Sequence, residues 1–97
     1  MPTFPAPTYV YLLNEVERWE GHNELSVHRT RQGARQAGIV RAEEYLRENP
    51  DRTQGHLAGE WAQDDDQEWK LPLQIDAEDG VVVLQHYLTI KALELKP

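Results

Sequence analysis

Residues 59–75 read GEWAQDDDQEWKLPLQI, and they are the most informative stretch of the chain about its fold. Trp61 and Trp69 flank a run of aspartates, Asp64–Asp66, and the second half of the stretch alternates apolar with polar residues. Alternation with a period of two is typical of a β-strand buried on one face, and consecutive aspartates favour a turn. The stretch therefore predicts a β-hairpin whose loop consists of the aspartates.

The register of this hairpin follows from the position of the loop. It pairs Gln63 with Gln67, Trp61 with Trp69, Gly59 with Leu71 and Leu57 with Leu73. Opposed side chains on one face of an antiparallel pair contact each other, so we expect Trp61 and Trp69 to form a cross-strand core pair. An exposed aromatic binding patch is the alternative, because tryptophan is enriched at interaction hot spots.

Two further strands are predicted upstream. The segment Tyr9–Val16 is rich in aromatic and aliphatic residues, as in a central strand, and Glu20–Asn23 has the composition of a turn. The segment Glu24–Thr30 then alternates apolar and polar residues. An antiparallel pair would place one set of side chains on a common face that we expect to be buried: Val10, Leu12, Val16, Leu25 and Val27.

One helix is predicted after these strands. Thr30 can cap its N-terminus, and the helix runs to Arg47, ahead of the Asn49–Pro50 pair. Small residues and one tyrosine share a face that would approach a sheet closely: Ala34, Gly38, Ala42 and Tyr45.

The C-terminal part predicts a last hairpin. Asp76–Gly80 is its turn, and Val81–Ile90 is the strongest β-run of the chain. A four-residue loop would place Trp69 opposite Leu88, and a five-residue loop would place it opposite Tyr87; the sequence leaves both open. A shift of the apolar phase near Lys91–Ala92 predicts a bulge or a bend there.

Together these elements predict a single α+β domain of order ββαβββ, with a mainly antiparallel sheet and one helix packed on one face. Residues 1–7 are a proline-rich arm and residues 8–97 are the domain. Because one helix covers one face, apolar residues on the other face need another cover: the proline-rich arm, a sharply curled sheet or another chain. Large uncovered apolar patches commonly mark contact sites. The aromatic candidates for such contacts are Tyr9, Tyr11 and Tyr87.

Composition excludes several classes. The chain has 97 residues, no Cys and a net charge of −7. Negative charge opposes the phosphate neutralisation on which nucleic-acid binding depends, so no direct nucleic-acid binding is expected. No apolar run is long enough to span a membrane, and a chain without cysteine is compatible with a reducing cytoplasm, which is the expected location.

No catalytic motif is present. The sequence lacks a phosphate-binding glycine loop, a metalloprotease helix and a serine nucleophile elbow. The four histidines are scattered, and His86 is interpreted as a hydrogen-bonded structural residue. We therefore expect no catalytic residues, no cofactor and no metal. A small-ligand or metal-dependent enzyme is the alternative, and it requires histidines and carboxylates to converge in the fold.

The aspartates Asp64, Asp65 and Asp66 are interpreted first as a solvated turn and next as an acidic contact point. They lack the spaced ligands and the glycine of a calcium loop.

Three segments carry a resemblance. The opening Tyr9–Glu17, the strand end Ser26–Thr30 leading into an alanine-rich helix, and the tryptophan hairpin with its final strand resemble small uncharacterised proteins common in actinobacterial genomes and phages. The resemblance covers most of the chain and implies a fold and a mobile-element origin. It supplies no catalytic residues.

We therefore expect an acidic protein–protein interaction module of an accessory, inhibitor or immunity type. The alternative within the same architecture is a structural homodimer that buries the second face of the sheet symmetrically. The candidate interaction residues are Trp61, Trp69, Asp64, Asp65, Asp66, Tyr9, Tyr11 and Tyr87.

Overall fold

A computed structural model describes residues 8–53, 60–65 and 67–95 of the chain. In chain order its elements are β1 Thr8–Glu17, β2 Gly21–His28, α1 Arg31–Glu48, α2 Pro50–Thr53, β3 Ala62–Asp65, β4 Glu68–Glu78 and β5 Val81–Leu95. This confirms the predicted α+β class and the order ββαβββ, with the single turn α2 added after α1. The proline-rich arm lies outside the described residues.

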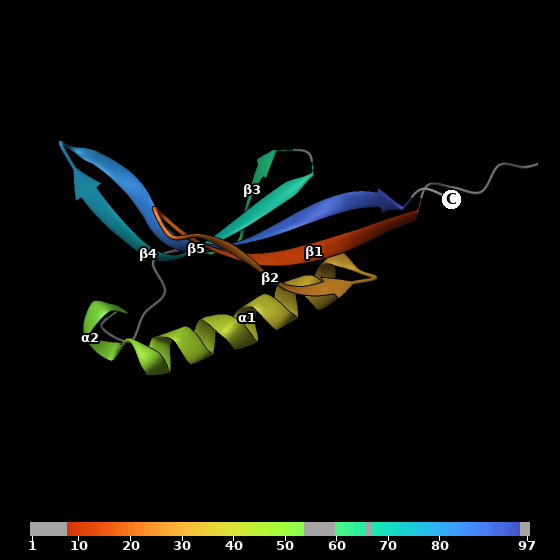
Figure 1. Cartoon of the computed structure of the whole chain (residues 1–97), viewed down its shortest axis with the longest axis horizontal. Coiled ribbons are helices and arrows are strands. Elements are labelled where there is room, and N and C mark those ends of the chain that lie inside the picture. The colour runs from red at the N-terminus through yellow and green to blue at the C-terminus, as the bar shows by residue number, and fades with distance from the viewer. Residues whose placement is uncertain (1–7, 54–59, 66, 96–97) are drawn as a thin grey trace, which may run out of the picture.

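All strands join one antiparallel sheet of five strands in the order β2-β1-β5-β4-β3. β1 and β5 lie in the interior, as the apolar character of their sequences predicted, and the edges are β2 and the short β3. α1 crosses beneath one side of the sheet, and no described helix lies on the other side (Figure 1). We call the side that α1 covers the helix face and the opposite side the open face.

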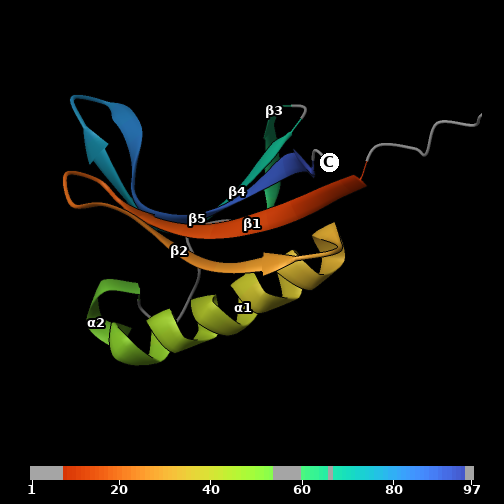
Figure 2. The ribbon, with the colours of Figure 1, turned by 45° about the vertical axis from the view of Figure 1, so that its right-hand side comes forward.

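α1 forms where the sequence predicted it. Thr30 caps the helix, because its hydroxyl accepts a hydrogen bond of 3.0 Å from the Gly33 amide. The predicted face is buried against the sheet: Ala34, Gly38, Ala42 and Tyr45. The small side chains let the helix axis approach the strands, and the rotated view shows α1 running along β1 and β2 (Figure 2).

The core lies between α1 and the helix face. Its largest fully buried side chains come from β1, β4 and β5: Leu13, Leu71, Leu73, Leu88 and Ile90. Burial of one such aliphatic side chain stabilises a fold by about 1.5–3 kcal/mol. The core therefore ties the helix to the central strands.

The predicted buried side of the first hairpin is wrong. Leu12 and Val27 share a face, as expected, and lie opposite each other, but that face is the open face, and Val27 is 61% exposed. The buried residue of β1 is Leu13, which reaches the helix. Since both faces of β1 are apolar, the strand pattern alone did not distinguish them.

The first turn is also displaced from its prediction. It consists of Arg18–Glu20 and is closed by a hydrogen bond of 3.1 Å from the Glu20 amide to the Glu17 carbonyl. The predicted turn residues Gly21–Asn23 belong to β2. The β1–β2 ladder also has a register shift between Leu13 and Asn14.

The predicted register of the tryptophan hairpin is wrong. Gln63 lies opposite Trp69, and Ala62 lies opposite Lys70, so Trp61 and Trp69 do not form a cross-strand pair. Asp64 and Asp65 belong to β3 instead of the loop. The expected pairs of Leu57 and Gly59 lie outside the described residues.

The last hairpin follows neither of the two predicted registers. Its loop is Asp79–Gly80, and Trp69 lies opposite Ile90. Asp79 and Gly80 have φ values of 51° and 80°, as in a type I′ turn, for which Asp-Gly is a preferred pair.

The predicted bulge near Lys91–Ala92 is absent from the β1–β5 ladder, which keeps one register from Thr8 to Glu17. The apolar phase changes there because Leu93 lies on the open face while Ile90 lies in the core. The shift in the sequence therefore marks apolar residues on a second face. Irregularities occur in β4 instead, between Pro72 and Ile75.

Candidate functional site: the polar cluster and the open face

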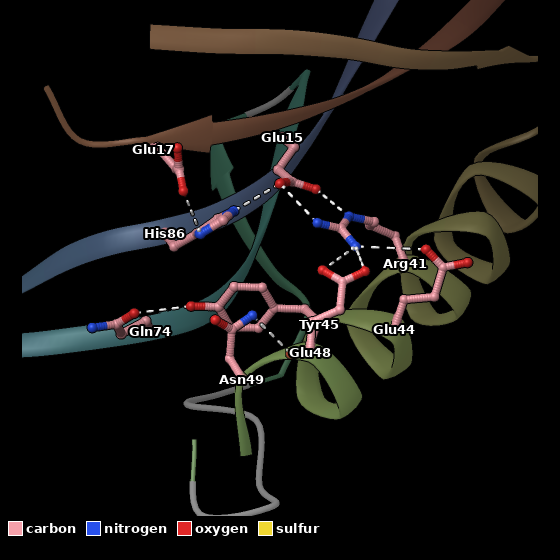
Figure 3. Close-up of polar contacts among 9 residues, drawn as sticks. All are labelled: Glu15, Glu17, Arg41, Glu44, Tyr45, Glu48, Asn49, Gln74 and His86. Atoms are coloured by element: carbon pink, nitrogen blue, oxygen red, sulfur yellow. Dashed lines mark hydrogen bonds and ion pairs between the residues drawn. The ribbon is translucent and has the colours of Figure 1, made fainter. Parts of the chain in front are cut away.

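A polar cluster joins α1 to the helix face of the sheet. Arg41 donates from Nε to Glu15 Oε1 and from Nη2 to Glu15 Oε2, the latter at 3.1 Å. The Arg41 Nη1 atom lies 3.4 Å from Glu48 and 3.5 Å from Glu44. Figure 3 shows the guanidinium between the sheet carboxylate and the acidic side chains of its own helix. The cluster therefore ties the middle of α1 to β1.

His86 extends the cluster across β5. Its Nε2 atom lies 2.9 Å from Glu15 Oε2, and its Nδ1 atom lies 3.3 Å from Glu17 Oε1. The ring also meets Tyr45 edge-on, with 4.6 Å between the ring centroids. His86 is buried and hydrogen-bonded, as expected of a structural histidine.

The irregular part of β4 completes the cluster. Leu73 is buried in the core, and the register shift beside it brings Gln74 opposite His86. The Tyr45 hydroxyl donates to Gln74 Oε1 at 2.9 Å (Figure 3). A bulge that re-aims one side chain thus supplies the partner that a buried tyrosine hydroxyl needs.

Electrostatic interactions in the cluster favour the ionised forms of Glu15 and Arg41, as the direction of their pKa shifts indicates. Burial alone would raise the pKa of Glu15, but the hydrogen bonds and charges of Arg41 and His86 outweigh it and lower that pKa below the ordinary value. The hydrogen bond to Glu15 likewise raises the pKa of Arg41. Glu15 and Arg41 therefore stabilise each other in their charged forms, and their ion pair links α1 to β1.

The open face has a different character. The registers align three rows across four strands: Val27–Leu12–Lys91–Glu68, Glu24–Asn14–Thr89–Lys70 and His22–Val16–Tyr87–Pro72. All of these residues except Val27, Lys70 and Pro72 line a trough of about 370 Å³. This volume lies within the range of about 300–1,000 Å³ typical of ligand pockets.

The floor of the trough is polar and buried. Asn14 and Thr89 are opposite each other on β1 and β5, and they are only 5% and 3% exposed. Among the described residues, neither Asn14 Oδ1 nor Thr89 Oγ1 has a hydrogen-bond partner, although both atoms are buried. An unsatisfied buried polar group costs about 1–3 kcal/mol. Among the described residues, no hydrogen bond of these two oxygens contributes to the stability of the fold.

Apolar side chains flank the trough at the end of the sheet where β5 terminates. Leu93 and Leu95 alternate with Lys91 on the open face and are 45% and 59% exposed. Val27 lies beside Leu12 at the same end. The open face therefore combines an exposed apolar area with a polar hollow.

The two tryptophan candidates lie against the core instead of on the open face. Trp61 packs on α1 at Gly38, and Trp69 is partly buried beside the same core. The Arg31 guanidinium lies 4.9 Å from the centre of the Trp69 ring. Both tryptophans thus contribute packing between helix and sheet.

The tyrosine candidates are divided between the faces. Tyr9 and Tyr11 alternate with Leu13 on the helix face of β1, and Tyr11 packs against the core. Tyr87 lies on the open face, lines the trough and has the Lys70 ammonium 5.4 Å from its ring centre. Of the three, Tyr87 alone lines the trough.

The acidic candidates do not form a cluster in the described part of the chain. Asp64 pairs with Lys70 at 2.9 Å, and this hydrogen bond raises the pKa of Lys70 above its ordinary value. Asp65 is in β3, and Asp66 lies outside the described residues. Within the described ranges no group of three or more histidines or acidic residues could hold a metal ion.

The described histidines do not converge. His28 and His86 lie on the helix face opposite Tyr11 and Glu17, six residues apart along β1, which corresponds to about 20 Å. His22 lies on the open face. His56 lies outside the described residues.

Three residues of interest escaped the sequence analysis: Asn14, Thr89 and Trp19. A polar residue within a strong apolar β-run was the available signal for Asn14 and Thr89. Trp19 is 85% exposed at the tip of the first hairpin and has a φ of 73°, a conformation usually left to glycine or asparagine. A bulky residue held in this region costs about 1–3 kcal/mol and often marks a functional site.

No family model, no curated protein and no solved structure matches this chain. Among the described helices, none has the length and apolar character needed to cross a membrane.

Proposed function

We propose that this chain is a non-enzymatic protein–protein interaction module that binds a basic partner protein through its open face. The observation that carries the proposal is the exposure of Val27, Leu93 and Leu95 on the face that α1 leaves uncovered. Contiguous apolar surface rimmed by polar residues is characteristic of contact sites. An accessory, inhibitor or immunity role fits a module that acts by occupying a partner surface.

Charge favours a heterologous and basic partner. The chain carries a net charge of −7, and a large net charge keeps copies of the same protein apart while it accelerates encounter with a basic surface. The homodimer is the second candidate, because the same apolar residues would serve a symmetric contact. We place the module in the cytoplasm, since a chain without cysteine suits a reducing compartment.

A capture experiment with matched variants tests the proposal. The tagged protein is incubated with lysate of its source organism, and bound proteins are quantified for wild type, Leu93→Glu and Val40→Glu. Leu93 lies on the open face, and Val40 is a comparably exposed apolar residue of α1. We expect one stoichiometric partner that Val40→Glu retains and Leu93→Glu loses.

Two results would count against the proposal. A partner that both variants retain does not use the open face, and recovery of no stoichiometric partner removes the basis of an interaction module.

A further inference from the structure

We infer that the trough of the open face is an anchor pocket for an arginine side chain of the partner protein. This inference rests on the proposed function and adds the chemistry that would make its contact specific. It starts from the floor of the trough, where Asn14 Oδ1 and Thr89 Oγ1 are buried without a partner among the described residues. Asn14 Oδ1 can only accept hydrogen bonds, and the Thr89 hydroxyl can accept as well as donate, so a donor group in the trough would satisfy both oxygens.

Within the described residues, these two oxygens form no hydrogen bond that holds the strands together. Asn14 and Thr89 face each other on the two central strands, where Leu12, Val16 and Tyr87 are their neighbours on the same face. Valine has nearly the shape of threonine, so an apolar pair would pack at this position without any unsatisfied oxygen. The polar floor is therefore explained by a ligand and not by packing.

The charges around the floor identify the type of donor. Glu24 lies opposite Asn14 on the β2 side of the trough and forms no ion pair among the described residues. On the β4 side, Lys70 is paired with Asp64 at 2.9 Å, and Lys91 lies opposite Glu68. Lys91 and Glu68 form no ion pair with each other among the described residues, and Glu24 is the carboxylate that lies in the same row as the two unpartnered oxygens.

A guanidinium group meets these requirements together. Its planar fork presents five N–H donors and can bond a carboxylate and neighbouring acceptors simultaneously. Register partners on adjacent strands are about 5 Å apart, so Glu24, Asn14 and Thr89 form a continuous row of hydrogen-bond acceptors across β2, β1 and β5. The aliphatic stem of arginine would lie along Leu12, Val16 and Tyr87, which also line the trough.

An NMR titration of the intact chain tests this inference. The probe is N-acetyl-arginine methylamide, and the matched control is the citrulline analogue, which has a similar shape without the charge. We expect saturable amide shifts centred on Asn14, Glu24 and Thr89, with the citrulline analogue at least about tenfold weaker because it forms no charge-assisted bond with Glu24. Shifts confined to other surfaces, equal binding of both compounds, or no saturable shift would overturn the inference and leave a trough that holds solvent only.

Variants of the trough provide the second measurement. Thr89→Val and Glu24→Gln are expected to weaken binding of the arginine probe severalfold, while Thr8→Val, the same change at the exposed end of β1, leaves it unchanged. Thr89→Val removes an unpartnered hydroxyl, so its denaturation midpoint should be no lower than that of wild type. Unchanged affinity in a folded Thr89→Val or Glu24→Gln protein would overturn the assignment of that residue to the pocket.

The two proposals fail separately. If Leu93→Glu abolishes partner capture but the arginine probe does not bind in the trough, the interaction module stands and the anchor pocket is wrong. If the probe binds while open-face substitutions leave partner capture intact, the assignment of partner binding to the open face is wrong, and the partner's arginine is excluded as the occupant.

Discussion

Gly38 of α1 and Trp61, the residue before β3, are in direct contact across the helix–sheet interface. A Cβ atom built on Gly38 would lie 2.5 Å from Trp61 Cζ2 and 3.4 Å from Leu13 Cδ1. The absence of a side chain at Gly38 therefore lets the indole ring lie against the helix. Trp61 is therefore partly buried against the core beside α1, and it does not pair with Trp69 across the hairpin.

The contact predicts the effect of one added methyl group. Gly38→Ala should lower the free energy of unfolding by about 1–2 kcal/mol, because overpacking against Trp61 outweighs a gain in helix propensity of up to about 1 kcal/mol. Urea denaturation followed by circular dichroism measures this change. Glu43→Ala on the exposed side of α1 is the control and should stay within about 0.5 kcal/mol of wild type. A Gly38→Ala protein as stable as wild type would contradict the close contact.

The ion pair between Arg41 and Glu15 predicts a second stability effect. Arg41→Gln should destabilise the fold by about 2 kcal/mol, because it leaves a mostly buried carboxylate without its charged donor. Arg47→Gln changes an exposed arginine in the last turn of α1 and should cost less than about 1 kcal/mol. Equal losses in the two variants would show that the buried pair contributes nothing specific.

The lowered pKa of Glu15 predicts that the stabilising effect of its ion pair with Arg41 is lost in acid. The folded-state pKa lies below the ordinary value of 4.5, so the unfolded chain binds the proton more readily. The resulting stability is complete above pH 4.5 and is lost as pH falls through the folded-state pKa. Urea midpoints measured at a series of pH values below 5 should fall more steeply in wild type than in Arg41→Gln. Parallel curves would contradict the role of Arg41 in lowering that pKa.

The positive φ of Trp19 predicts that two substitutions at this position differ in stability. Asparagine tolerates a positive φ and alanine does not, so Trp19→Asn should be about 1 kcal/mol more stable than Trp19→Ala. Both variants remove the exposed indole, so their difference isolates the backbone strain. If thermal or urea denaturation ranks them equally, the turn is unstrained.

The sequence was sufficient for the elements whose pattern is local. The Thr30 cap and the small-residue face from Ala34 to Tyr45 specify the helix, and the apolar run from Val81 specifies a central strand. The registers depend on features outside those patterns. The last hairpin is set by the positive φ values of Asp79 and Gly80, a turn signal that the longer predicted loops overlooked.

The covered face of the sheet could not be predicted for a different reason. Leu12 and Leu13 are both leucines, and only the position of α1, with Gly38 against Leu13, decides which of them is buried. The trough could not be predicted either, because Asn14 and Thr89 lie side by side only as a result of the β1–β5 register. Their pairing is a long-range property that no single strand pattern contains.

We propose that no second copy of the chain covers the open face in solution and that this face binds a different protein. Sedimentation velocity across a concentration series tests it most directly, since a self-association through Leu93 and Val27 would appear as a rise in mass with concentration. We expect the measured mass of wild type and of Leu93→Glu to be that of the monomer, 11.2 kDa, at every protein concentration. A wild-type dimer that Leu93→Glu converts to monomer would contradict it and would assign the open face to a second copy of the chain.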